Sequence, residues 1–456
     1  MDREKGFMQK EKRDIMVLPA AFEDRMKKML GEEYEAFRAS YSQPHKRGIR
    51  LNTLKSTKEN LEKTLDFSLE NTPFSPLSFY APVDLKMASL PLYHAGAFYS
   101  QEPSASSAVT LLDPQPGEKI LDLCAAPGGK STQIAALTGD RGLLWSNEVV
   151  RSRASILASN LERMGVRNAV VSSVYPDQLA EKLTGYFDRI LVDAPCSGEG
   201  MFRRDETAIT EWSPEHVEMC AVRQLAILDS AAQCLREGGV LVYSTCTFSA
   251  EENEGVVLRF LEKHPEFVLE KPEVTFGRPA YGVDAVRIFP MDGGEGHFAA
   301  RFKRVGENVS QASEYPYKPD KQTDSTAKAL YRELFDDEPG RFVRIKDRIL
   351  MLPDVMPDIS GLGVVRAGVE FGELKKNRIE PCHGIFMAKR TEVCRNVLRL
   401  SYDDPRVHAF LRGEEIEAEG CKGYTAVSVE GAVVGFGKAS NGVLKNKYPK
   451  GLRTHG

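Results

Sequence analysis

The chain of 456 residues has no apolar run of about 18 residues, which is the length that a membrane-spanning helix needs. It also has no excess of basic charge, because 61 lysines and arginines stand against 65 aspartates and glutamates, for a net charge of −4. This balance argues against a surface that is basic all over, but it leaves room for a local basic groove. Residues 1–5 are mostly charged and no apolar signal-peptide core follows them, so we expect a cytoplasmic protein that is not attached to a membrane.

The cysteine spacing argues against two common uses of this residue. The eight cysteines form no CxxC pair, and no histidine accompanies them at the spacing of a zinc site. The neighbours Cys382 and His383 are too few to hold a metal, so we expect none. A disulfide framework is not expected in so long a cytosolic chain. Four of the cysteines are expected to be small buried side chains, namely Cys220, Cys234, Cys394 and Cys421.

The length of the chain indicates several domains, since it exceeds what one ordinary hydrophobic core supports. Apolar residues three and four apart over residues 18–41 predict an amphipathic helix. Residues 305–326 are rich in Ser, Gln, Asp, Lys and Pro and predict a linker. The expected units are an α+β accessory domain (1–95), a catalytic domain (96–304), the linker, an α+β accessory region that begins with a helix near 330–335 (327–392) and a strand-rich C-terminal domain (393–456).

Strand-like and helical patterns alternate through the predicted catalytic domain. The strands are expected at 120–123, 142–146, 169–171, 189–192 and 240–243, the helices at 130–137, 149–164, 214–236 and 250–263, and a closing hairpin at 287–302. Such alternation is typical of an α/β fold in which a parallel sheet carries helices on both faces.

A glycine turn directly after the first of these strands predicts a nucleoside-binding site. The turn reads Cys124, Ala125, Ala126, Pro127, Gly128, Gly129, Lys130 and opens a helix. Small residues let the backbone approach a ligand, and a helix start offers free N–H groups. Glu148, just past the second strand, can accept hydrogen bonds from ribose hydroxyls. The turn lacks the GxGxxG form, so a nucleoside is favoured over a pyrophosphate ligand; a plain tight turn with a surface glutamate is the alternative.

Two cysteine motifs follow later strands of the same domain. They are Asp193-Ala194-Pro195-Cys196 and Ser244-Thr245-Cys246. The carboxyl ends of parallel strands meet at one edge, so both thiols are expected at one cleft. A thiolate that adds to C6 of a cytosine makes C5 nucleophilic, and the ring needs a hydrogen-bond partner and help with release of the thiol. Cys246, Asp193 and Cys196 are suited to these three tasks, although a buried strand-end thiol would explain Cys246 alone.

The glycine turn and the two cysteine motifs resemble the Nol/Nop/Sun family of RNA 5-methylcytosine methyltransferases, and the rest of the chain resembles its bacterial RsmF-type rRNA enzymes. The resemblance implies a Rossmann-like core and S-adenosylmethionine as cofactor, with a PUA-like RNA-binding region at 393–456. It implies that Cys246 attacks the base, that Cys196 aids release of the product, and that Asp193 and Lys130 belong to the active site. The implied cofactor contacts are Cys124 to Lys130, Glu148, Arg153, Asp193 and, in place of an acid that the family often carries, Ser173 or Asp177.

The resulting prediction is an enzyme that methylates C5 of a cytosine in ribosomal RNA, with the small-subunit rRNA as the expected partner. A monomer is expected, acting on the RNA alone or within a small ribosomal subunit. Three alternatives stay open: a tRNA substrate with the same chemistry, a DNA cytosine-5 methyltransferase in which Cys196 attacks, and a non-catalytic ribosome-assembly factor. Replacing Cys246 and Cys196 separately and trapping the adduct would show which thiol attacks, and a test for methyl transfer to rRNA would decide on the assembly factor.

Several residues around these motifs have simpler expected roles. Basic side chains are expected to contact RNA phosphates, namely Arg203, Arg204, Lys46, Arg47, Arg50 and the lysines of the last twenty residues. Trp212 is expected to pack at a helix start, and His297 is expected to be structural rather than catalytic.

Overall fold

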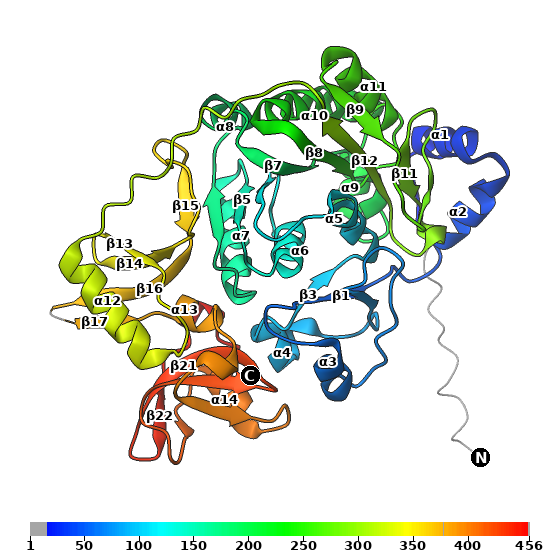
Figure 1. Cartoon of the computed structure of the whole chain (residues 1–456). Helices are drawn as coiled ribbons and strands as arrows, with labels where there is room; N and C mark the ends of the chain where they lie inside the picture. The colour runs from blue at the N-terminus through cyan, green and yellow to red at the C-terminus, as the bar shows by residue number, and fades with distance from the viewer. Residues whose placement is uncertain (1–15, 377, 455–456) are drawn as a thin grey trace, which may run out of the picture.

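The structure is a computed structural model that describes residues 16–376 and 378–454 (Figure 1). The predicted absence of a secretory signal rests on residues that lie outside this part of the chain. None of the helices in the described part is long and apolar enough to cross a membrane.

A ten-stranded sheet forms the centre of the molecule. Its strand order is β10-β11-β12-β8-β7-β4-β5-β6-β15, and β9 also pairs with β12. The strands are β4 (Lys119–Asp122), β5 (Leu143–Asn147), β6 (Ala169–Ser172), β7 (Phe187–Asp193), β8 (Leu235–Thr245), β9 (Phe267–Glu270), β10 (Arg278–Pro279), β11 (Ala285–Ile288), β12 (His297–Arg304) and β15 (Val364–Ala367). The five strands from β4 to β8 run parallel, as predicted, while β12 and β15 are antiparallel to their neighbours. The chain order reverses between β4 and β7, where ligands bind in such sheets.

Helices cover both faces of this sheet, which confirms the predicted α/β class. They are α5 (Ser107–Leu112), α6 (Gly129–Thr138), α7 (Arg151–Arg163), α8 (Pro176–Lys182), α10 (Pro214–Cys234) and α11 (Glu254–Lys263), whereas the short α9 (Glu206–Glu211) packs with the N-terminal helices. Successive strand residues point to opposite faces, so Leu121 packs with Leu228 of α10 while Ile120 packs with Leu157 of α7. The short α8 was not predicted.

The predicted helix over residues 18–41 is broken into α1 (Ala20–Leu30) and α2 (Tyr34–Ser40) by a tight turn at Gly31, whose φ is +54°. Its apolar face packs against the segments that follow β7 and β8, through Phe202 and Phe248. The N-terminal helices therefore support the loops that carry the two cysteine motifs.

A small antiparallel sheet follows these helices, with order β2-β1-β3. Its elements are β1 (Gly48–Leu51), β2 (Ser78–Tyr80) and β3 (Phe98–Gln101), with α3 (Lys58–Thr64) and α4 (Pro91–His94) between them. Because β3 pairs with β1, the boundary predicted at residue 95 falls inside this sheet. The sheet brings Gln101 to the edge of the central domain.

The region after residue 304 is tied to the catalytic sheet more closely than predicted. Helix α12 (Lys321–Leu334) begins inside the predicted linker, and Tyr315 N donates to Met356 O. The strands β13 (Arg341–Ile345), β14 (Arg348–Leu352), β16 (Val369–Lys375) and β17 (Arg378–Pro381) form a four-stranded sheet followed by α13 (His383–Met387). Between β14 and β16 the chain leaves to add β15 to the edge of the central sheet beside β6.

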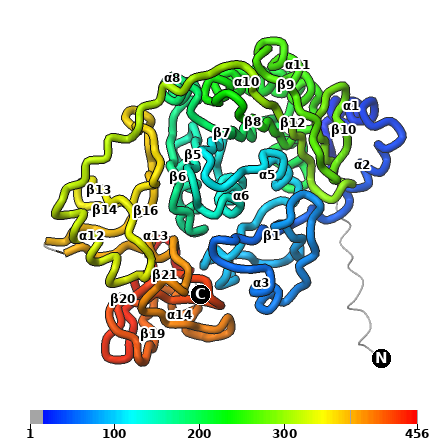
Figure 2. Tube along the Cα trace, in the orientation of Figure 1, coloured from blue at the N-terminus to red at the C-terminus, as the bar shows by residue number. Residues whose placement is uncertain are grey.

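The last domain is a five-stranded sheet of order β18-β20-β21-β22-β19. Its elements are β18 (Val397–Leu400), α14 (Pro405–Arg412), β19 (Ile416–Glu417), β20 (Gly423–Val429), β21 (Ala432–Ser440) and β22 (Val443–Asn446). Figure 2 shows it beside the small N-terminal sheet, and the two share one core in which Ile49 and Leu92 join Val407 and Val427. Both accessory ends of the chain thus form one continuous body next to the catalytic domain.

Candidate active site

The glycine turn joins β4 to α6 at the point where the chain order reverses. Gly128 has φ of +111°, which an L side chain rarely adopts, and a Cβ there would meet Leu157 Cδ1 at 3.1 Å. The backbone of the turn is fixed from the next strand, because Ala125 N donates to Asn147 O at 2.8 Å. Small residues are therefore required in this turn by the close approach of α7 as well as by any ligand.

Arg50 of β1, in the small N-terminal sheet, contacts the end of the same turn. Its Nη2 donates to Gly129 O at 3.0 Å and to Thr132 Oγ1 at 2.6 Å, and its Nε donates to Gln101 Oε1 at 2.9 Å. Arg50 is fully buried, and burial lowers the pKa of its guanidinium to about 9. The predicted contact of Arg50 with RNA phosphates is therefore wrong, because its guanidinium donates its hydrogen bonds to the start of α6.

Glu148 and Arg153 connect the end of β5 to the turn. Glu148 Oε1 accepts from Val150 N at 2.9 Å, and Glu148 Oε2 lies 3.2 Å from Arg153 Nη1. Arg153 in turn donates to Ala126 O at 3.1 Å. Ser173 lies nearby and donates to Val149 O at 3.1 Å. These contacts place Glu148, Arg153 and Ser173 near the glycine turn. Their contact with a cofactor stays a prediction.

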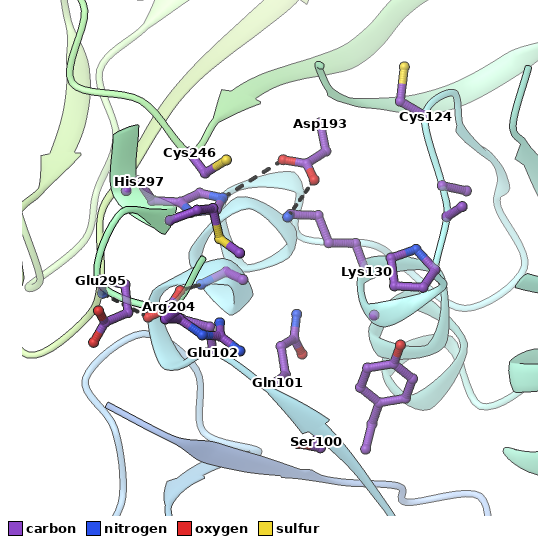
Figure 3. Close-up of a pocket in the computed structure, with 18 of the residues that line it drawn as sticks. Ser100, Gln101, Glu102, Cys124, Lys130, Asp193, Arg204, Cys246, Glu295 and His297 are labelled. Carbon is purple, nitrogen blue, oxygen red and sulfur yellow. Dashed lines mark hydrogen bonds and ion pairs between the residues drawn. The ribbon is translucent and has the colours of Figure 1, made fainter. Parts of the chain in front are cut away.

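A cavity of about 290 Å³ opens at the carboxyl ends of β4, β7 and β8 (Figure 3). The predicted site residues that line it are Cys124, Ala125, Ala126, Pro127, Gly129, Lys130, Asp193 and Cys246. The remaining ones lie outside its lining: Gly128, Glu148, Arg153, Ser173 and Cys196. Residues that were not predicted to be catalytic or cofactor-binding complete it, namely Tyr99, Ser100, Gln101, Glu102, Ala105, Asp122, Gly200, Met201, Arg204, Glu295, Gly296 and His297.

An ion pair stands in the middle of this cavity. Lys130 Nζ donates to Asp193 Oδ2 at 2.7 Å, while Ser244 Oγ donates to Asp193 Oδ1 at 2.8 Å. Burial alone would raise the pKa of Asp193, but the charge of Lys130 and the neighbouring His297 hold it well below its ordinary value. Burial would lower the pKa of Lys130, yet Asp193 raises it above its ordinary value. The pair therefore presents a carboxylate and an ammonium at neutral pH.

The two motif cysteines meet at this cavity as free thiols. Cys246 Sγ lies 3.2 Å from Cys196 Sγ, and Cys246 faces the cavity while Cys196 stands behind it. The contact with Cys246, together with burial, raises the pKa of Cys196 well above its ordinary value. Cys196 is therefore a neutral thiol whose S–H can donate to Cys246 Sγ.

The loop that carries Cys196 is pinned by Glu252, which sequence patterns did not reveal. Glu252 Oε2 accepts from Ser197 N at 2.9 Å and from Gln224 Nε2 at 2.8 Å. Gly200 N also donates to Cys246 O at 2.8 Å, and a Cβ on Gly200 would lie 2.9 Å from that oxygen. These contacts lock the Pro-Cys loop onto the end of β8, which fixes the distance between the two sulfurs.

Asp122 gives the cavity a buried acid next to the glycine turn. Its Oδ2 accepts from Ser131 Oγ at 2.7 Å, whereas its Oδ1 has no hydrogen-bond partner among the described residues. Burial raises the pKa of Asp122 to about 7. A cation placed beside this oxygen would pair with it, so the acids Asp122, Glu148 and Asp193 around one turn fit a positively charged cofactor.

The other basic residues divide into structural and accessible ones. Arg203 is nearly buried, with Nη1 3.2 Å from Glu295 Oε1, so its predicted RNA contact is wrong. Arg204 is exposed at the cavity mouth and keeps that prediction.

Trp212 packs against Phe22 and donates to Glu199 Oε1 at 2.8 Å, which confirms its packing role. Residues 16–376 and 378–454 contain no cluster of His, Cys, Asp and Glu that could hold a metal.

Comparison with known proteins identifies the family. The model for the 16S rRNA methyltransferase RsmB/F matches residues 109–303, and three RsmF models match the N-terminal domain (18–103), the first C-terminal domain (327–388) and the PUA domain (397–454). The ribosomal RNA small subunit methyltransferase F of Vibrio parahaemolyticus is 32% identical over 95% of this chain and 97% of its own. The chain belongs to the RsmB/F family of rRNA methyltransferases.

Other relatives of this RsmB/F chain agree. The Vibrio atlanticus enzyme of the same description is 33% identical over 91% of this chain and 93% of its own. The crystal structure of a methyltransferase homologue from Pyrococcus horikoshii is 29% identical, has a TM-score of 0.57 and covers 63% of this chain and 96% of that one. Membership confirms the predicted methyltransferase class, its dependence on S-adenosylmethionine and the PUA-like C-terminal domain.

Proposed function

We propose that the chain methylates C5 of a cytosine in small-subunit ribosomal RNA through a transient bond between Cys246 Sγ and C6 of the base. The observation that carries the proposal is the arrangement in one cavity of Cys246, the Asp193–Lys130 pair and a second thiol 3.2 Å away. A plain RNA-binding surface has no use for such a set, so a non-catalytic assembly factor is disfavoured.

The reaction is an addition to the base, followed by methyl transfer and elimination. The Cys246 thiolate forms the S–C6 bond, and the electrons of the C5–C6 double bond move to C5. C5 then takes the methyl group, whose donor is S-adenosylmethionine and leaves as a neutral thioether. The C5 proton passes to a base, the C5–C6 double bond forms again, and the electrons of the S–C6 bond return to sulfur.

The Asp193–Lys130 pair suits the polar edge of a cytosine. An ionised Asp193 accepts hydrogen bonds but donates none, so it pairs with the N4 amino group rather than with N3. Lys130 carries the proton of the pair and can donate to the ring nitrogen or oxygen on which charge develops. The two side chains thus divide the task that the sequence assigned to Asp193 alone.

Cys196 assists the last step. Its raised pKa keeps it protonated, and its Sγ lies 3.2 Å from the sulfur from which the base must depart, so it can donate to that sulfur. A hydrogen bond to that sulfur favours the thiolate over the carbon–sulfur bond and so speeds release. This is the role that the resemblance implied.

The residues around the glycine turn hold the cofactor. Asp122 offers an unpaired carboxylate oxygen, and Glu148 a carboxylate at the end of β5 where ribose hydroxyls are bound in related folds. Bound there, S-adenosylmethionine supplies an electrophilic methyl group. Ser173 and Arg153 complete the proposed contacts at the outer side of the turn.

The substrate base must leave its helix to reach Cys246, since the sulfur lies inside a cavity rather than on the surface. The PUA domain and the exposed Arg204 are suited to hold the surrounding RNA. Ribosomal RNA is favoured over tRNA because the curated relatives that span the chain are described as small-subunit rRNA methyltransferases.

The test uses small-subunit rRNA from cells that lack the protein, labelled with tritium at C5 of its cytidines. With S-adenosylmethionine, we expect tritium release that matches methyl incorporation one for one. Cys246→Ala abolishes both, whereas Cys421→Ala, a thiol in the last domain, changes neither. Cofactor binding without transfer to rRNA or tRNA would favour the assembly factor, and adducts in Cys246→Ala but not in Cys196→Ala would favour attack by Cys196.

A further inference from the structure

The proposed reaction needs a base for the C5 proton, and the residues assigned so far cannot serve. Lys130 already holds its proton, and the pKa of Asp193 is held too low for an effective base. Cys196 is a thiol, because its pKa is raised well above its ordinary value. A further group must therefore accept the proton on the side of the ring that faces Cys246, since the methyl group arrives on the opposite face.

His297 is the buried nitrogen base that stands at this place. It begins β12, is 4% exposed and lines the cavity. Its Nδ1 lies 3.1 Å from Gly296 O, an oxygen that can only accept a hydrogen bond, so a neutral ring that makes this bond carries its hydrogen on Nδ1. Its Nε2 has no hydrogen-bond partner among the described residues. Nε2 faces Asp193 Oδ1 at 3.8 Å along the wall of the cavity, and in the neutral ring its lone pair is not used in a hydrogen bond.

The sheet register places His297 beside the attacking sulfur. Strand β12 pairs antiparallel with β8, and Phe298 stands opposite Thr245. His297 and Cys246 are each one residue further, so they follow this pair on the two neighbouring strands. Figure 3 shows both on one side of Asp193, with Cys124 of the cofactor turn on the other side. A cytosine bound between Cys246 and Cys124 has the face that carries the sulfur toward His297. Its opposite face is toward the glycine turn.

The distance between His297 and Asp193 indicates which atom of a bound cytosine lies near His297, namely C5. His297 Nε2 lies 3.8 Å from Asp193 Oδ1. The N4 amino group, from which Asp193 accepts in the proposed function, is attached to C4. C5 is the ring carbon next to C4, so it lies beside His297. The Asp193 carboxylate can also balance the charge of an imidazolium.

We propose that Nε2 of His297 is the base that takes the proton from C5; this rests on the function proposed above. The C5–H electrons form the C5–C6 double bond, and the electrons of the S–C6 bond return to Cys246. The imidazolium then gives its proton to water. Glu295 also lines the cavity, with its pKa raised to about 7 by burial, but its Oε1 accepts from Lys46 N at 2.5 Å and faces Arg203. Figure 3 shows its carboxylate turned away from Cys246.

The experiment compares His297→Gln with His297→Phe on rRNA that carries tritium at C5. Glutamine keeps a hydrogen-bonding group but is no base, and phenylalanine keeps the ring volume, so both are expected to slow tritium release by about 100-fold or more. Because addition and methyl transfer precede this step, both variants should accumulate a methylated covalent complex with the RNA. In His297→Ala, added imidazole should restore part of the release, a result that a purely structural role does not produce. Glu295→Gln tests the rival carboxyl group of the cavity and should release tritium much faster than either His297 variant.

The outcomes separate the two proposals. A wild-type chain that transfers no methyl group overturns the proposed function, and this inference falls with it. A wild type that is active, with His297→Gln or His297→Phe equally fast, overturns only the role of His297. Loss of cofactor binding in the variants, measured by calorimetry, or slow release in Glu295→Gln with normal release in the His297 variants, would also overturn it.

Discussion

Replacing Cys196 by alanine should slow release of the RNA without preventing attack on it. The variant removes the thiol whose Sγ lies 3.2 Å from Cys246 Sγ. A hydrogen bond to a charged acceptor contributes about 1.5–3 kcal/mol, and a thiol is a weak donor, so the lower part of this range applies. We therefore expect the methylated adduct to decay about 10- to 30-fold more slowly than in the wild type.

The assay is a single turnover with excess enzyme over rRNA, quenched in denaturant and resolved as free and protein-linked RNA. The wild type should show a brief adduct and Cys196→Ala a persistent one, while Cys421→Ala should follow the wild type. The reasoning is refuted if Cys196→Ala releases RNA as fast as the wild type, or if it forms no adduct at all, since the second result would make Cys196 the attacking thiol.

Three further predictions follow from the cavity. Lys130→Met leaves Asp193 without its cation and removes a donor to the ring, so methyl transfer in single-turnover assays should fall about 100-fold or more; a rate within threefold of wild type would contradict this role. Burial raises the pKa of Asp122 to about 7, and a cationic cofactor needs its carboxylate form. The affinity for S-adenosylmethionine, measured by calorimetry, should therefore weaken by up to about tenfold per pH unit below about pH 7. Asp122→Asn should abolish this pH dependence. In Gly200→Ala the new Cβ meets two backbone carbonyl oxygens at 2.9 Å, so denaturant unfolding should show a loss of about 1–3 kcal/mol, whereas Gly451→Ala, which meets nothing within 4 Å, should be neutral.

Much of the catalytic domain could be predicted because its pattern is local. Strand 120–123 and helix 214–236 were expected within two residues of β4 and α10, since apolar periodicity and flanking glycines mark them. The same logic placed Cys246 and Asp193 at one edge of the sheet, because parallel strands deliver their ends together. These are the residues that line the observed cavity.

The errors concern residues whose partners lie far along the chain. Residues 364–367 pair with β6, almost two hundred residues earlier, and no local pattern records such an edge strand. Arg50 has the charge of an RNA contact, but its hydrogen bonds go to Gly129 and Thr132. His297 was expected to be structural, because a lone histidine in a strand reveals nothing about the cavity that this residue lines.

The central claim is that the sulfur of Cys246 bonds to C6 of the target cytosine. The most direct measurement uses rRNA transcribed with 5-fluorocytidine, which accepts the methyl group but cannot lose fluorine as a proton, so the adduct is retained. After digestion, mass spectrometry should find a methylated fluorocytidine nucleotide on the peptide that contains Cys246. The same nucleotide on the peptide that contains Cys196, with Cys246 unmodified, would contradict the account.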